Sequence, residues 1–140
     1  MTSHRHESSS SLAASRRLPA PIIGILLRAR TSENSAIGPA RRRAWQLTRG
    51  LIHATLSAGY SAAMIAAELG VTSGSVRNRA GVTGYLDATE LLELADLGQD
   101  TLDQWLLDGL LPRTTVDEFD RPMYAAEDII LGLVRQGSIG

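Results

Sequence analysis

A chain of 140 residues with 44% hydrophobic and only 4% aromatic content can form one domain, or two very small ones, around a modest aliphatic core. The absence of cysteine excludes disulfides, thiolate zinc sites and cysteine nucleophiles, and no apolar run reaches the roughly 18 residues that a membrane span needs. These properties predict a soluble, cytoplasmic protein without membrane contact.

The formal net charge of −1 conceals a sharp division of charge along the chain. Residues 1–83 contain eleven Arg and three Glu, a balance of +8, whereas residues 84–140 contain three Arg and twelve acids, a balance of −9. Such a division indicates different partners for the two halves. Every basic residue is Arg, whose planar guanidinium suits phosphate and guanine, although a GC-rich genome is the simpler explanation of that bias.

Residues 1–20 are rich in Ser and have no apolar period, which predicts a disordered tail. The tail contains His4, His6 and Glu7, which we interpret as incidental because a metal site needs three or four converging ligands. Residues 22–27 are all apolar except for Gly24 and are ambiguous between a short strand and a helical turn. Our interpretation is a small helix that caps the first domain.

Stronger helix signals begin at Gly38. Pro39 suits a first turn, and an amphipathic pattern continues to Gly59. Ser61 is the expected cap of a second helix that ends at Gly70, and Thr72 or Ser73 is the expected cap of a third that ends near residue 81. Within the first helix, Trp45 and His53 are interpreted as packing residues.

The segment at residues 62–81 resembles the helix-turn-helix motif. Ala66 is the small residue that two closely crossing helices need, and Gly70 can take the positive φ of the turn. The resemblance implies that the helix at residues 72–80 lies in the major groove of DNA. Arg79 departs from the motif, which usually has an apolar residue there, so either the helix is rotated or Ala80 packs instead.

The resemblance also assigns DNA contacts. Hydroxyl, amide and guanidinium groups on a recognition helix pair with base edges, and the expected base contacts are Thr72, Ser73, Ser75, Arg77, Asn78 and Arg79. The supporting helix is expected to contact phosphates through Arg41, Arg42, Arg43 and Arg49. The alternatives are a simple helix cap for Ser73 and a solvated surface for the arginines.

The acidic half is expected to form two helices, a short hairpin or loop at residues 112–124, and a last helix. It resembles the winged-helix module of the MerR and excisionase families in the pair Thr101–Leu102, the run from Gly109 to Pro112, and Arg121, Tyr124, Asp128 and Ile129. The resemblance implies DNA binding through the second helix and the wing, where Arg113 and Arg121 are the expected phosphate contacts.

The second helix departs from that family. Asp103 stands where an Arg usually follows the Thr-Leu pair, and residues 84–108 contain seven acids and no base. Such a surface repels phosphate. Three interpretations remain open: the module contacts DNA by its wing alone; it serves as a protein-docking or dimerisation unit; or its acids meet the Arg-rich half of the same or another chain. We favour the protein-facing role.

No phosphate-binding loop, catalytic triad or metal-ligand set is present in the sequence, so neither enzymatic activity nor a cofactor is expected.

We expect a mainly α fold, with a trihelical helix-turn-helix domain at residues 21–83 and a small winged-helix, MerR-like domain at residues 84–140. The expected function is sequence-specific transcriptional regulation, as a repressor of a phage or mobile element associated with the nucleoid. The expected partners are double-stranded DNA and, through the acidic half, itself or another protein. The alternatives are an excisionase-like architectural factor and an antitoxin or inhibitor that uses its acidic half.

Overall fold

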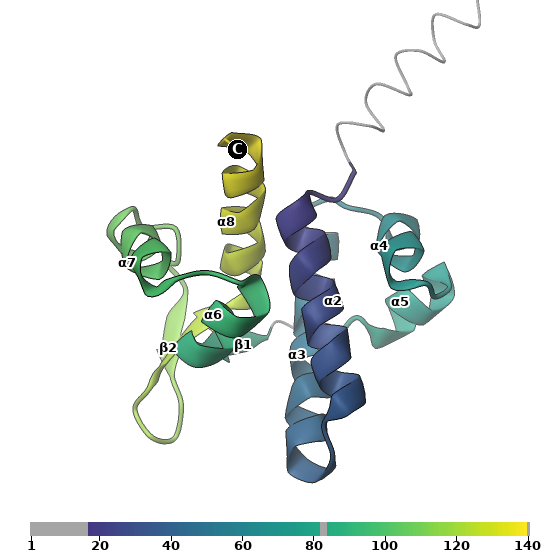
Figure 1. Ribbon diagram of the computed structural model, residues 1–140, viewed down its shortest axis with the longest axis horizontal. Helices are drawn as coiled ribbons and strands as arrows, with labels where there is room; N and C mark the ends of the chain where they lie inside the picture. The colour runs from purple at the N-terminus through teal and green to yellow at the C-terminus, as the bar shows by residue number, and fades with distance from the viewer. Residues whose placement is uncertain (1–16, 82–83, 140) are drawn as a thin grey trace, which may run out of the picture.

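The computed structural model describes residues 17–81 and 84–139, with the side chains of the last helix described as far as Gln136. Within these residues the chain is mainly helical, as expected, with seven helices and one small three-stranded sheet. Figure 1 shows a pair of long helices with two short helices of the N-terminal half on one side and the acidic half on the other.

The central pair consists of α2 (Ala20–Ser35) and α3 (Gly38–Ser57), which runs back alongside α2. The sequence predicted a small helix here, and the structure confirms a helix but one of 16 residues, longer than expected. The buried positions of α2 are Ile22, Ile25, Leu26, Ala29 and Glu33, a helical stripe. The stripe ends in a small residue and a carboxylate, so only its first two turns have the apolar signature of a buried helix.

Two short helices follow, α4 (Ala62–Leu69) and α5 (Ser73–Arg79), and their ends lie where the sequence placed them. The Ser61 hydroxyl accepts a hydrogen bond from the Met64 amide, and the Thr72 hydroxyl accepts one from the Ser75 amide. Gly70 has a φ of 68° between the two helices. Of the two expected caps of α5, Thr72 rather than Ser73 is therefore the capping residue.

The acidic half contains β1 (Tyr85–Asp87), α6 (Ala88–Ala95), α7 (Gln99–Leu107), β2 (Thr114–Val116), β3 (Pro122–Ala125) and α8 (Ala126–Ile139). The strands are antiparallel in the order β1-β3-β2, with Leu86 opposite Tyr124 and Thr115 opposite Met123. The expected hairpin is thus present, and β1 adds a strand that was not expected.

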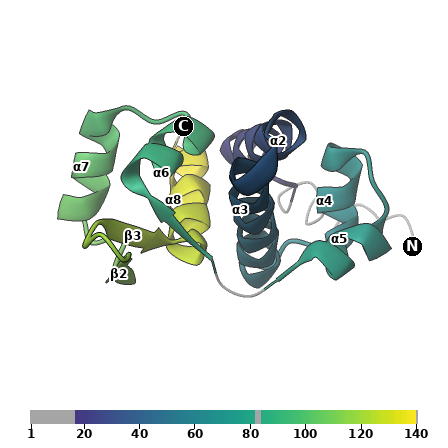
Figure 2. The ribbon, with the colours of Figure 1, turned by 90° about the horizontal axis from the view of Figure 1, so that it is seen from below.

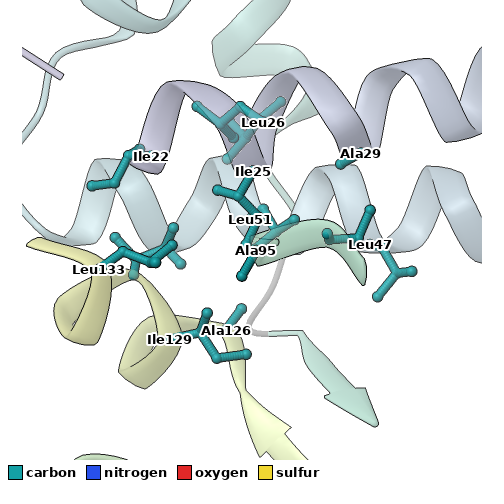
Figure 3. Packing of buried hydrophobic residues seen from close by; sticks show 14 of the residues in the cluster. Ile22, Ile25, Leu26, Ala29, Leu47, Leu51, Ala95, Ala126, Ile129 and Leu133 are labelled. Carbon is teal, nitrogen blue, oxygen red and sulfur yellow. The ribbon is translucent and has the colours of Figure 1, made fainter. Parts of the chain in front are cut away.

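The two halves share one core. Figure 3 shows side chains of α2, α3, α6 and α8 pointing toward one another, and buried apolar residues from both halves form a single cluster. Gly50 on α3 lies so close to Gly84 that a Cβ added to it would be 3.0 Å from the Gly84 Cα. The expected domain boundary lies between residues 83 and 84, next to residues 82–83, which the structure does not describe. Helices α2 and α3 contact elements that precede this boundary and elements that follow it. The expected disordered tail extended to residue 20, yet Leu18 is buried.

Candidate nucleic-acid interface

Helix α5 is fixed on its inner side and displays polar groups on its outer side. Val76 is buried against the core, whereas Arg77 and Asn78 are exposed. Thr72 is exposed, but its hydroxyl is engaged in the cap; Ser73 and Ser75 are half-buried. Of the six expected base contacts, Arg77 and Asn78 therefore have side chains that are both exposed and long enough to extend from the surface.

Arg79 points elsewhere. Its guanidinium forms a hydrogen-bonded ion pair with the carboxylate of Glu33 on α2, and the two side chains are 28% and 7% exposed. A carboxylate this deeply buried needs a partner, and Arg79 is that partner. Ala80 packs against the core, as one of the two sequence-based alternatives required. Arg79 is thus placed to attach α5 to α2 rather than to contact a base.

Arg49 supports the same end of α5. Its Nε donates to the carbonyl oxygen of Arg79 at 2.9 Å, and its guanidinium lies 4.4 Å from the centre of the Trp45 ring. Trp45, interpreted from the sequence as a packing residue, is 42% exposed and packs against Arg49 at the surface rather than in the core. Arg49, expected to contact phosphate, instead ties α3 to the last turn of α5.

The first turns of α3 present two exposed arginines. Arg41 and Arg42 are exposed and, with Trp45, Arg79 and the buried Glu33, line a shallow hollow of about 620 Å³. No hydrogen bond or ion pair engages Arg41 or Arg42 within the described residues. These two arginines therefore remain available for an anion beside α5.

Arg43 links the two halves. It donates to both carboxylate oxygens of Glu90 at 2.9 and 2.8 Å, and to the carbonyl oxygen of Tyr85 at 2.8 Å. The hydrogen bond to Glu90 raises the pKa of Arg43. Burial alone would raise the pKa of Glu90, but its hydrogen bonds with Arg43 and with the Asp87 backbone outweigh burial and hold that pKa below 4.5. Arg43 was expected to contact phosphate, but it instead joins α3 to α6 through its ion pair with Glu90.

Both arginines of the hairpin region are also paired with acids. Arg113 donates to Glu127 at 3.0 Å and to the buried Asp128 at 2.6 Å, and these hydrogen bonds, those to Asp128 first, raise the pKa of Arg113. Arg121 donates to Asp117 at 2.8 Å. Hydrogen bonds from the backbone and side chain of Arg121 lower the pKa of Asp117. A phosphate contact by either arginine has to compete with these carboxylates.

Helix α7 presents a surface of the opposite charge. Asp100, Asp103 and Asp108 are exposed, and the hydrogen bonds that Asp103 and Asp108 accept come from neutral glutamines. Leu106 and Leu107 are exposed on the same helix. An exposed acidic and apolar surface of this kind is unsuited to a phosphate backbone.

Glu33, the residue that determines what Arg79 does, was not among the site residues predicted from the sequence. Its only signal was that it is one of three acids in the first 83 residues. Arg28 and Arg30 were missed as well: they donate to the backbone carbonyls of Leu94 and Leu69. Five of the arginines of the basic half, Arg28, Arg30, Arg43, Arg49 and Arg79, thus hold neighbouring elements in place through carbonyl or carboxylate groups.

Residues 17–81 and 84–139 contain no group of three or more His, Asp or Glu side chains that could hold a metal ion. His4, His6 and Glu7 lie outside the described residues. In the described part of the chain, no helix combines the length and apolarity that crossing a bilayer requires.

Comparison of the chain with protein-family models, with curated proteins and with solved structures gave no match.

Proposed function

We propose that the protein binds double-stranded DNA through a helix-turn-helix unit formed by α4 and α5, with α5 in the major groove. The observation that supports this most strongly is the state of α5: Arg77 and Asn78 are exposed on a helix that Thr72, Arg79 and Arg49 hold in place. Arginine pairs with guanine and asparagine with adenine through two parallel hydrogen bonds each. A rigid support aligns such pairs at low entropic cost.

Arg41 and Arg42 supply the phosphate contacts in this proposal. They are exposed near the end of α5, and each phosphate they neutralise releases a counterion. Arg43, Arg49 and Arg79 act as supports, which reduces the expected DNA contacts to a smaller set than the sequence suggested.

We further propose that β1, α6, α7, the β2–β3 hairpin and α8 form a winged-helix module in which the second helix, α7, does not face DNA. The order of the elements and the antiparallel sheet support this assignment. The acids of α7 and the paired state of Arg113 and Arg121 argue against a phosphate contact there. DNA binding by the basic half would exclude other proteins from the bound site, so the proposed role is transcriptional regulation by repression.

The test is selection of bound sequences from random duplex DNA with the full chain, followed by fluorescence anisotropy on the selected site over a range of salt concentrations. Arg77→Ala with Asn78→Ala is expected to cost about 1–3 kcal/mol per lost base pair contact and to relax the base preference. Arg41→Ala with Arg42→Ala is expected to weaken binding to all sequences and to reduce the salt slope by about two.

The matched control is Arg135→Ala, which removes an exposed arginine from α8. It is expected to leave affinity and salt slope unchanged. Undiminished affinity of the Arg77→Ala/Asn78→Ala variant, or a loss in the control equal to that of the other variants, would refute α5 as the DNA-contacting helix.

A further inference from the structure

Two exposed surfaces of the chain combine large apolar side chains with charge of one sign. On α7, Leu107 is 82% exposed and stands one turn after Asp103 on the same side of the helix. Leu106 is exposed beside it, and Asp100 precedes Asp103 on that side. We call these four residues the α7 face.

The second surface lies at the start of α3. Ile37, which precedes the helix, is 83% exposed, and Trp45 is exposed two turns later. Arg41 and Arg42 lie between them on the side that lines the hollow described above. We call Ile37, Arg41, Arg42 and Trp45 the α3 face. The Glu33 carboxylate in that hollow is already paired with Arg79, so it adds no unpaired negative charge.

The two faces cannot meet within one chain. Figures 1 and 2 both show α7 at one end of the molecule, with α6 and α8 between it and α3. Their complementary charges and exposed apolar groups are therefore available to different copies of the chain. Water-exposed apolar side chains gain free energy on burial, and opposite charges around them select the partner and its orientation.

We propose that the α7 face of one copy docks on the α3 face of a second copy, so that the protein associates head to tail. Leu107 enters the hollow beside Trp45, while Asp100 and Asp103 approach Arg41 and Arg42. Each such contact leaves the α3 face of the first copy and the α7 face of the second copy free to bind further copies. The assembly therefore grows into a chain or closes into a ring. It also covers the arginines assigned to phosphate, so DNA and a second copy compete for the α3 face.

The experiment is sedimentation velocity of the full chain without DNA, which makes its outcome independent of the proposed DNA binding. At about 0.05 M NaCl the average mass is expected to rise with concentration, and at about 0.5 M salt the association is expected to weaken because screening removes the charge contribution. A wild-type chain that remains a monomer at about 100 µM in low salt overturns the proposal.

Variants identify the two faces. Asp103→Arg with Leu107→Ser on α7, and Arg41→Glu with Arg42→Glu on α3, are each expected to weaken self-association by at least about tenfold. An equal mixture of the two variants keeps one intact α7 face and one intact α3 face, so it is expected to associate more strongly than either variant alone. A symmetric α7–α7 contact would instead leave the α3 variant dimeric on its own, which contradicts the proposal.

The matched control is Glu118→Arg with Leu131→Ser, which changes an exposed acid and an exposed leucine elsewhere. It is expected to associate like the wild type. Every substituted position in these variants is exposed, and an unchanged melting temperature is the criterion that each variant is folded. Association that survives both double variants, or that the control abolishes equally, overturns the assignment of the two faces.

Discussion

Removing the side chain of Arg79 tests whether this arginine supports α5 or contacts DNA. In Arg79→Ala the Glu33 carboxylate, whose side chain is only 7% exposed, loses its ion-pair partner. Arg77, two residues earlier on the same helix, is exposed and has no such partner among the described residues. Substitution of Arg79 is thus predicted to lower the stability of the protein, whereas substitution of Arg77 is predicted to lower its affinity for DNA.

The expected size of the effect follows from burial. Breaking a fully buried ion pair by removing one partner costs about 3–5 kcal/mol because a charge is left unsolvated. Arg79 is 28% exposed, so water can partly replace it, and we expect a loss of about 2–3 kcal/mol in the free energy of unfolding. For a chain of this size that corresponds to a melting temperature lower by about 10 °C. Arg77→Ala is expected to change the free energy of unfolding by at most about 0.5 kcal/mol.

Thermal and urea unfolding of the two variants, followed by circular dichroism, measures this difference. A third variant, Glu33→Met with Arg79→Met, removes both charges and is expected to recover most of the loss, since an apolar pair of similar volume needs no partner. Equal stability of Arg79→Ala and Arg77→Ala would refute the reasoning. So would an Arg79→Ala variant that loses DNA affinity at wild-type stability, because that result assigns Arg79 to the DNA contact.

Three further predictions concern stability. A Cβ on Gly132 would lie 2.9 Å from the ring of Trp105, so Gly132→Ala is expected to destabilise by about 1–2 kcal/mol in urea unfolding despite its better helix propensity; stabilisation would show that the ring moves freely. Gly70→Ala places a side chain at a φ of 68° and is expected to cost about 1 kcal/mol, whereas an unchanged midpoint would contradict the strained turn. Because the folded-state pKa of Glu90 is depressed, its contribution to folding stability is present above the ordinary pKa of 4.5 and is lost as pH falls through the lower folded-state pKa. Between about pH 6 and about pH 3, the melting temperature of Glu90→Gln is therefore expected to fall less steeply than that of the wild type. Parallel curves for the two proteins would contradict this.

The helix boundaries of the basic half could be predicted because they depend on local chemistry. Ser61 and Thr72 cap through their own hydroxyls, and Gly70 adopts the positive φ that its lack of a Cβ allows. In the acidic half, Asp87 likewise caps α6 and forms a capping box with Glu90. Each of these interactions spans at most three residues, so the sequence contains all of the information.

The partners of the arginines could not be predicted because they lie far apart in the chain. Arg79 and Glu33 are 46 residues apart, and Arg43 and Glu90 are 47 residues apart. A count of charges therefore overestimated the arginines available to DNA. Helix α2 was underestimated for a related reason: its later buried positions, Ala29 and Glu33, are buried by tertiary contacts that an apolar pattern does not register.

The shared core has a consequence for how the protein can be dissected. A fragment that ends near residue 81 would expose Ile22, Ile25 and Leu51, which are fully buried in the intact chain. Their apolar side chains face α6 and α8 as well as one another (Figure 3). Such a fragment would be prone to aggregation rather than an isolated DNA-binding domain. The roles of the two halves are therefore better separated by surface substitutions in the full-length chain than by truncation.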